Sequence, residues 1–286
     1  MHRAHIIGYP VLLLSVLKLF LGLLLLRQNP RNSPVNKATA ACAFVAAIWS
    51  LSAAFMYIRV SLGQDFIFFA RASWIGWFTV PTALQTVLFL KDEKSRKARI
   101  TGYVLYPFWS VALCLSLFTD LIVTDGYMPI PYRNSPGPLE MYFRLAGGLM
   151  VFWLIYEIVR LRRQVTGYRR SQLNYYLYGT IIFGTGGAVV GGFLQLFTGH
   201  GLEPSLSTYT SFPWVLMIFY AISRHRLFDI RLIFSRTVII LFLSFFISAL
   251  QFELFKILEP VAGAVASIFI SVPIIGVIFF ATPLSK

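Results

Sequence analysis

The sequence predicts an all-α membrane protein, a polytopic bundle of about nine transmembrane helices arranged as seven plus two. Of its 286 residues, 57% are hydrophobic and only 13% are charged, whereas a soluble domain carries about 25% charged residues. The charges fall in short clusters between long apolar stretches. Each stretch has the length of about 20 residues that an α-helix needs to cross the hydrocarbon core.

Hydropathy along the chain places the expected helices in order, and charged or turn-forming segments separate them. The first, third, fifth and seventh end at the basic segments RQNPRNSPVNK, KDEKSRKAR, RLRRQVTGYRR and RHRLFDIRLIFSR. The second, fourth, sixth and eighth end at SLGQD, the long segment 119–140, GHGLEPS and the turn at EP. The expected spans are 5–26, 38–60, 66–90, 100–118, 141–160, 173–198, 205–222, 237–258 and 260–281.

The two sets of connecting segments differ in charge. The second set contains Arg133 as its only internal basic residue. Its acidic residues are Asp65, Asp120, Asp125, Glu140, Glu203 and Glu259. Because basic loops stay on the cytoplasmic side, the N-terminus is expected outside and Lys286 inside. The net charge of +14 is therefore explained by topology and contact with anionic lipids, and no nucleic-acid partner is expected.

The spans divide the chain into three expected parts. Residues 1–222 form a seven-helix membrane bundle, 223–236 a basic cytoplasmic junction, and 237–286 a two-helix hairpin. The hairpin is expected to lead into a cytoplasmic output domain that this chain lacks. The outer segment 119–140 is rich in Pro, Gly, Tyr and Asp, which predicts a structured cap or lid over the bundle.

Ionisable residues inside spans are functional candidates, because a charge in lipid is costly. They are Lys18, Arg71, Arg144, Glu157, Glu253 and Lys256. For most of them the favoured interpretation is snorkelling toward a helix end. Arg71 and Arg144 have two open interpretations: ion pairs with Asp65 and Glu140, or guanidinium donors to a ligand carbonyl, lactone or carboxylate.

Aromatic residues inside the spans predict a ligand pocket in the outer half of the bundle. Prolines in the third, fourth and seventh spans favour this, because they kink helices and open cavities between them. An interfacial aromatic belt with ordinary core packing is the alternative for each residue. With the two arginines, the candidate ligand-binding residues are Arg71, Trp74, Trp77, Trp109, Arg144, Gln195, Tyr209 and Trp214.

No catalytic constellation is evident in the sequence. Its four histidines lack the spacing of a metal or acid–base pair, so no catalytic residue, metal or cofactor is expected. Cys42 and Cys114 both lie in apolar stretches, which favours two lone thiols over a disulfide.

The segment FYAISRHRLFDIRLIFSRTVI resembles the end of the seven-transmembrane sensor region found at the N-terminus of many bacterial histidine kinases. In that family the seventh helix runs into a YAI-x-R-x-R-L-x-D-I-R junction. The matching residues are Tyr220, Ala221, Ile222, Arg224, Arg226, Leu227, Asp229, Ile230 and Arg231. Weaker support comes from NPRN after the first span, Trp49 in the second and LNYYLYG in the sixth.

The resemblance implies the membrane-embedded input domain of a two-component sensor kinase in the bacterial inner membrane. It implies a cytoplasmic kinase module in the same chain, a response regulator downstream and a homodimer, for which we expect the last two spans to form the interface. A nine-helix layout with an outer N-terminus is similar to that of quorum-sensing kinases that bind acyl-homoserine lactones. A small amphipathic or lipophilic ligand, such as an autoinducer, is implied. Kinase activity itself is not expected of this chain, because phospho-accepting histidine and ATP-binding motifs are not found in it.

Two other functions are weighed against this one. A small-solute transporter or channel-like permease would use the same cavity as a path, but polar residues would then continue to the cytoplasmic side. The polar residues of the spans are instead concentrated in the outer half. A membrane enzyme ranks third for lack of an acid–base or metal constellation.

The junction 223–236 mixes charge with apolar residues, and topology explains only the charge. On a helical wheel Leu227, Ile230 and Phe234 share one side, with Arg226 and Asp229 roughly opposite. This favours an imperfect interfacial helix that connects the seven-helix bundle to the last two spans. The residues expected to couple the signal are Arg224, Arg226, Asp229 and Arg231.

Overall fold

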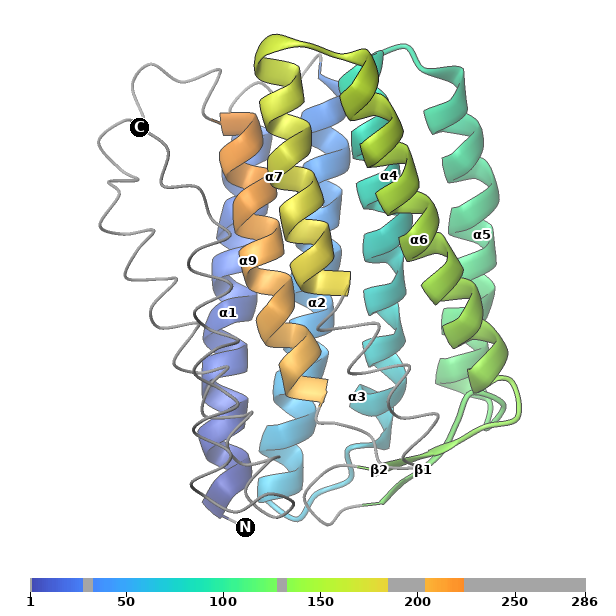
Figure 1. The fold of residues 1–286 in the computed structure, drawn as a ribbon. Helices are drawn as coiled ribbons and strands as arrows, with labels where there is room; N and C mark the ends of the chain where they lie inside the picture. The colour runs from blue at the N-terminus through green and yellow to red at the C-terminus, as the bar shows by residue number, and fades with distance from the viewer. Residues whose placement is uncertain (1, 28–32, 128–132, 185–203, 224–286) are drawn as a thin grey trace, which may run out of the picture. The chain divides into compact units, whose positions relative to one another are not determined.

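The computed structural model describes residues 2–27, 33–127, 133–184 and 204–223, and their long helices form one bundle (Figure 1). Helix α1 (His2–Arg27) packs along α2 (Pro34–Ser61). On α1 the buried residues Val11, Leu14 and Leu25 recur with helical spacing. The opposite face is exposed and equally apolar, as expected of a surface that contacts lipid tails. Its residues include Leu13, Val16, Leu19, Phe20 and Leu23.

The third span is interrupted, whereas the sequence predicted one helix over 66–90. It consists of helix α3 (Ile67–Ala72), the 3₁₀ helix η1 (Ser73–Phe78) and helix α4 (Thr79–Lys91). Hydroxyls bond to the backbone at both ends of η1: Ser73 Oγ donates to Ala70 O and Thr79 Oγ1 to Gly76 O, each at 2.6 Å. Side-chain bonds of this kind compete with the regular α-helical pattern. Short 3₁₀ segments within helices often mark functional hinges.

The remaining described helices are α5 (Arg96–Phe118), α6 (Glu140–Gln164), α7 (Gly167–Gly184) and α9 (Pro204–Ser223). Three of them lie close to predicted spans, whereas α7 begins six residues before the predicted span 173–198, whose end lies outside the described residues. Within the described residues, four helical segments are long and apolar enough to cross a membrane: Gly8–Arg27, Pro34–Ser61, Arg96–Phe118 and Glu140–Gln164. The eighth and ninth spans and the junction from residue 224 onward lie outside the described part of the chain, so the nine-helix layout stays a prediction.

The segment predicted as a cap contains a β-hairpin, an element that an all-α class does not include. Strands β1 (Val123–Tyr127) and β2 (Arg133–Pro136) pair antiparallel, with Tyr127 opposite Arg133. Two backbone bonds of 2.9 Å close its base, from Gly137 N to Ile122 O and from Leu139 N to Leu121 O. At Gly137 a β-carbon would lie 2.3 Å from Leu121 O, so glycine permits this close approach of two backbones.

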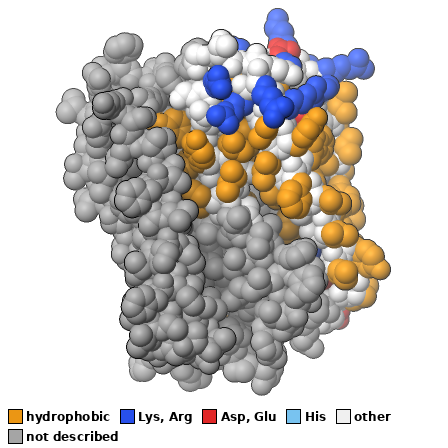
Figure 2. All heavy atoms as spheres, in the orientation of Figure 1, with side chains coloured by type: hydrophobic (Ala, Val, Ile, Leu, Met, Phe, Trp, Pro, Cys, Tyr) orange, Lys and Arg blue, Asp and Glu red, His pale blue; other side chains and the backbone are white. Residues whose placement is uncertain are grey.

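Basic side chains gather at the end of the bundle opposite the hairpin, above a band of hydrophobic side chains (Figures 1 and 2). The α4–α5 and α6–α7 connections meet at this basic end, where Lys91 Nζ donates to Gln164 Oε1 at 2.8 Å. Arg169 also donates there to the carbonyl oxygen of Lys91 at 3.5 Å. Helix α9 ends at the same end of the bundle (Figure 1), immediately before the predicted junction.

Candidate functional site

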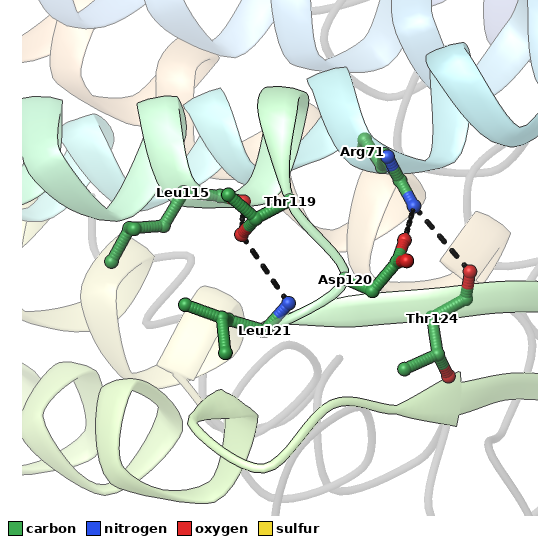
Figure 3. Close-up of polar contacts among 6 residues, drawn as sticks. All are labelled: Arg71, Leu115, Thr119, Asp120, Leu121 and Thr124. Atoms are coloured by element: carbon green, nitrogen blue, oxygen red, sulfur yellow. Dashed lines mark hydrogen bonds and ion pairs between the residues drawn. The ribbon is translucent and has the colours of Figure 1, made fainter.

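Arg71 joins the third span to the hairpin (Figure 3). Its guanidinium forms an ion pair with Asp120 and donates to Thr124 O at 3.4 Å. The carbonyl of Arg71 accepts a 3.0 Å bond from Ser116 Oγ on α5. Of the two open interpretations of Arg71, an ion pair is found, but its partner is Asp120 and not Asp65, whose Oδ1 accepts from the backbone N–H of Ile67 at the start of α3. Arg71 thus contacts both the end of α5 and the first strand of the cap.

Arg144 and Glu140 form the second ion pair at the hairpin end, which was one of the two open interpretations of Arg144. The Arg144 Nε donates to Glu140 Oε1 at 2.8 Å, one helical turn away on α6. The carboxylate is almost fully buried, with 2% of its side chain exposed. The guanidinium of Arg144 also lies 6.0 Å from the ring centroid of Trp74, within the range of a cation–π interaction. This contact attaches α6 to the 3₁₀ segment η1.

The aromatic residues predicted in the third and fourth spans meet in one cluster with Phe143 of α6. The rings of Trp77 and Trp109 stack with centroids 5.3 Å apart and planes 6° from parallel. Trp74 meets Phe143 edge-on at 6.4 Å, and Phe143 lies 6.3 Å from Trp109. Trp109 is fully buried, and its indole N–H points to the sulfur of Met150 at 3.3 Å. We call Trp74, Trp77, Trp109 and Phe143 the aromatic cluster.

Gly147 makes this packing possible. A β-carbon at Gly147 would lie 2.1 Å from Cζ3 of Trp77, whereas one at the neighbouring Gly148 would meet no atom within 4 Å. The Trp77 ring therefore rests on the backbone of α6. Neither Phe143 nor Gly147 was singled out from the sequence, because their importance comes from contacts with residues of other helices that are distant in the sequence.

The candidate residues of the seventh span form a separate group on α9. Trp214 is fully buried, stacks on Phe183 with centroids 4.6 Å apart, and donates from its indole N–H to Thr180 Oγ1 at 3.3 Å. Tyr209 is also buried, with 5% exposed. The two groups are linked by Trp49 of α2, which meets Phe183 at 6.0 Å and lies against Gly76 of η1. A β-carbon on Gly76 would lie 2.8 Å from the Trp49 ring.

Two buried polar atoms near the hairpin end have no hydrogen-bond partner among the described residues. They are Nε of Arg71, a donor, and Oε2 of Glu140, an acceptor. Buried polar groups are nearly always hydrogen-bonded, so an unpartnered one requires an explanation. An acceptor group would satisfy the Arg71 atom, and a donor group would satisfy the Glu140 atom.

Lys18 is a candidate that the sequence analysis interpreted wrongly. It lies in the middle of the candidate span Gly8–Arg27 and is 0% exposed, so it does not snorkel to a helix end. Its ammonium bonds to groups of α2 and α9. The helical spacing of Ser15, Lys18 and Gly22 in a leucine-rich span was the available sign that this face is turned inward.

The other predictions for ionisable and reactive residues have mixed outcomes. Glu157 pairs with Arg160 at 3.2 Å, one turn nearer the basic end. Cys42 and Cys114 are both free thiols, as predicted. Among the described residues, no three His, Cys, Asp or Glu side chains are grouped as metal ligands. The predicted residues Gln195, Arg224, Arg226, Asp229 and Arg231, together with Glu253 and Lys256, lie outside the described residues.

Comparison with known protein families gives one match. The sequence model described as the N-terminal 7TM region of histidine kinase matches residues 10–231. The match spans all the described helices except the first turns of α1, and it ends at the last arginine of the RHRLFDIR motif. A search of curated proteins returned no match.

Proposed function

The chain belongs to the family of N-terminal seven-transmembrane regions of histidine kinases, and we propose that it detects a small amphipathic or lipophilic molecule, such as an autoinducer. Membership makes it the membrane-embedded sensory region of such a kinase, in a multi-pass protein whose expected location is the bacterial inner membrane. The observation that carries the ligand proposal is the combination of the aromatic cluster with the two unpartnered atoms at the hairpin end.

The chemistry of this region suits a ligand with one polar and one apolar part. Arg71 Nε offers an N–H donor to a carbonyl, lactone or carboxylate oxygen, and Glu140 Oε2 offers an acceptor to an amide or hydroxyl. The rings of the aromatic cluster and the nearby Phe108 supply apolar surface. Of the cluster, Trp77 and Phe143 are half-buried rather than buried, so an acyl chain would contact these two first.

Signal transmission is proposed to run through α9. This helix carries Trp214 and Tyr209 and ends at the basic end of the bundle, directly before the junction. The aromatic contacts from Gly76 through Trp49 and Phe183 to Trp214 provide a packed connection from η1 to α9. Ligand binding would favour one arrangement of these helices over another, by the difference in its affinity for the two.

The partners follow from the family. A histidine kinase sensor region acts together with a cytoplasmic kinase module. We propose that this module is joined in the same chain through the predicted spans 237–258 and 260–281, that the protein signals as a homodimer, and that a response regulator receives the phosphoryl group. Arg224, Arg226, Asp229 and Arg231 are proposed to couple α9 to these last spans.

A binding assay tests the ligand proposal. The protein is placed in lipid nanodiscs, and binding of radiolabelled N-acyl-homoserine lactones of increasing acyl length is measured for the wild type, Trp77→Ala and Trp153→Ala. Trp153 lies on α6, the helix that carries Phe143 and Gly147. It is 40% exposed and serves as the matched control. Saturable binding that is lost in Trp77→Ala and retained in Trp153→Ala is expected; equal binding by both variants would place the ligand elsewhere.

A second measurement tests the coupling residues. In the full-length kinase, Arg226→Ala and Asp229→Ala are expected to abolish the response of autophosphorylation to ligand while binding is retained. A normal response in both variants would mean that these junction residues do not couple the signal and that the segment is only a connecting loop.

A further inference from the structure

Lys18 is the one described ionisable side chain that lies in the middle of a membrane-spanning segment and is completely buried there. Its Nζ donates to Ser50 Oγ at 2.5 Å, to Ser211 Oγ at 2.6 Å and to Thr208 O at 3.2 Å. Ser50 belongs to α2, and Thr208 and Ser211 to α9. The side chain of Lys18 thus connects three helices, and its most distant partner, Ser211, lies 193 positions away in the sequence.

The hydrogen bonds around Lys18 have a defined direction. Ser50 Oγ donates its own proton to Ala46 O at 2.7 Å, and Ser211 Oγ donates to Thr208 O at 2.6 Å. Both hydroxyls therefore present lone pairs to Nζ. Three acceptors match the three N–H donors of an ammonium group.

No acid neutralises this charge in the described part of the chain. The ion pairs there join Arg71, Arg144 and Arg160 to carboxylates, and none of them includes Lys18. A buried charge without a counter-ion is costly, and in membrane proteins such residues are commonly functional. Packing alone does not require a charge here, because hydrophobic residues of similar volume often replace buried ionic groups without loss of stability.

Lys18 also links α9 to α1 and α2. Of its three bonds, two go to α9, the helix that ends directly before the junction. By contrast, within the described part of the chain the neighbouring Ser15 bonds only to Ala47 O of α2, at 2.8 Å. Any movement of α9 relative to α1 and α2 has to break or rearrange the bonds of Lys18, whereas the Ser15 bond is unaffected.

We propose that Lys18 is a positioning residue for signalling: its buried ammonium, held by Ser50, Ser211 and Thr208, fastens α9 to α1 and α2 in one of two signalling states. Breaking these bonds favours the other state. The proposal rests on the transmission through α9 proposed above and is independent of the ligand and its site.

The test measures basal autophosphorylation, without ligand, in the full-length kinase in lipid nanodiscs. The variants are Lys18→Met, Ser211→Ala and Ser50→Ala, with Ser15→Ala as the matched control. All three test variants are expected to change basal output in the same direction. The change is about fivefold for each serine variant, as the loss of one hydrogen bond implies, and larger for Lys18→Met.

A measurement of the unfolding temperature distinguishes a signalling role of Lys18 from a role in the stability of the fold. In Lys18→Met the two serine hydroxyls keep their bonds to Ala46 O and Thr208 O, so no polar group is left unpaired and a buried charge is removed. The unfolding temperature is therefore expected to stay level or rise while output changes. If Lys18→Met does not accumulate in the membrane, the two serine variants carry the test.

Asp229→Ala distinguishes failure of this inference from failure of the proposed transmission. Output that changes in Asp229→Ala but stays at the wild-type level in Lys18→Met and Ser211→Ala overturns the role of Lys18 alone. Output that changes in none of the variants overturns both. Equal changes in Ser15→Ala and Ser211→Ala also overturn it, because any α1 contact would then suffice.

Discussion

Arg71 illustrates how a single residue attaches the cap to the bundle. Its guanidinium bonds to Asp120 before β1 and to Thr124 O within it, while its backbone carbonyl is bonded from α5. Asp120 is 74% exposed. An exposed ion pair of this kind stabilises a fold by about 0.2–1 kcal/mol, so the contact positions the hairpin and contributes little to the stability of the bundle.

Replacement of Asp120 tests this role. In Asp120→Asn the cap is expected to loosen, because Arg71 loses its charged partner, while the unfolding temperature hardly changes. Hydrogen exchange measured by mass spectrometry should become faster over residues 119–140. Asp92→Asn, in the α4–α5 connection at the opposite end, is the control. Unchanged exchange in Asp120→Asn would mean that backbone pairing alone holds the hairpin.

Gly147 and Gly148 offer a matched pair of substitutions at the aromatic cluster. Gly147→Ala places a methyl group at 2.1 Å from the present position of Trp77 Cζ3, whereas Gly148→Ala meets no neighbour within 4 Å. We expect Gly147→Ala to destabilise the protein by about 1–3 kcal/mol through overpacking. Gly148→Ala should be neutral or slightly stabilising. Thermal unfolding in detergent compares them, and equal unfolding temperatures would contradict the contact.

At the scale of elements, the interrupted third span determines how the aromatic groups meet. The 3₁₀ segment η1 presents Trp74 and Trp77 toward α5 and α6, and it places Gly76 against Trp49 of α2. An α-helix has 3.6 residues per turn, whereas a 3₁₀ helix has 3.0. The direction of every side chain after Ser73 therefore depends on this short segment.

Gly76 tests the link from η1 to α9. In Gly76→Ala the new methyl group would lie 2.8 Å from the Trp49 ring, which has to move and disturb Phe183 and Trp214 behind it. We expect an altered near-ultraviolet circular dichroism spectrum, because the stacked Phe183 and Trp214 rings contribute to it. Gly148→Ala again serves as the control. An unchanged spectrum would mean that Trp49 moves without its neighbours.

At the scale of the whole molecule, the described bundle has two chemically different ends. Lysines and arginines gather at one end above an apolar band (Figure 2), and the hairpin lies at the other (Figure 1). This distribution supports the predicted orientation, in which the basic end faces the cytoplasm. The proposed ligand region would then lie toward the outside, and α9 would carry the signal inward.

Cysteine labelling in whole cells tests the orientation. In a background without Cys42 and Cys114, Asp120→Cys and Lys94→Cys are treated with a membrane-impermeant maleimide. Because Asp120 lies next to the hairpin and Lys94 at the basic end, we expect labelling of Asp120→Cys alone in intact cells and of both after permeabilisation. Labelling of Lys94→Cys alone in intact cells would show that the orientation is opposite to the predicted one.

The sequence by itself determined the membrane class, the approximate limits of the first five spans and of the seventh, and the family. These properties depend on local quantities: the length of apolar stretches, the charge of the loops between them, and a junction motif of consecutive residues. The Arg144–Glu140 pair was also within reach, because its members are one helical turn apart.

The tertiary structure decided which side chains face the interior of the bundle. In a membrane bundle both faces of a helix are apolar, so hydropathy does not distinguish lipid contact from core. Helix α1 exposes Leu13, Val16 and Leu23 and buries Lys18, the reverse of a soluble helix. The ion pair of Arg71, the contact of Trp77 with Gly147 and the three bonds of Lys18 join residues from 32 to 193 positions apart. Contacts over such separations depend on how the helices pack, which no local pattern of residues specifies.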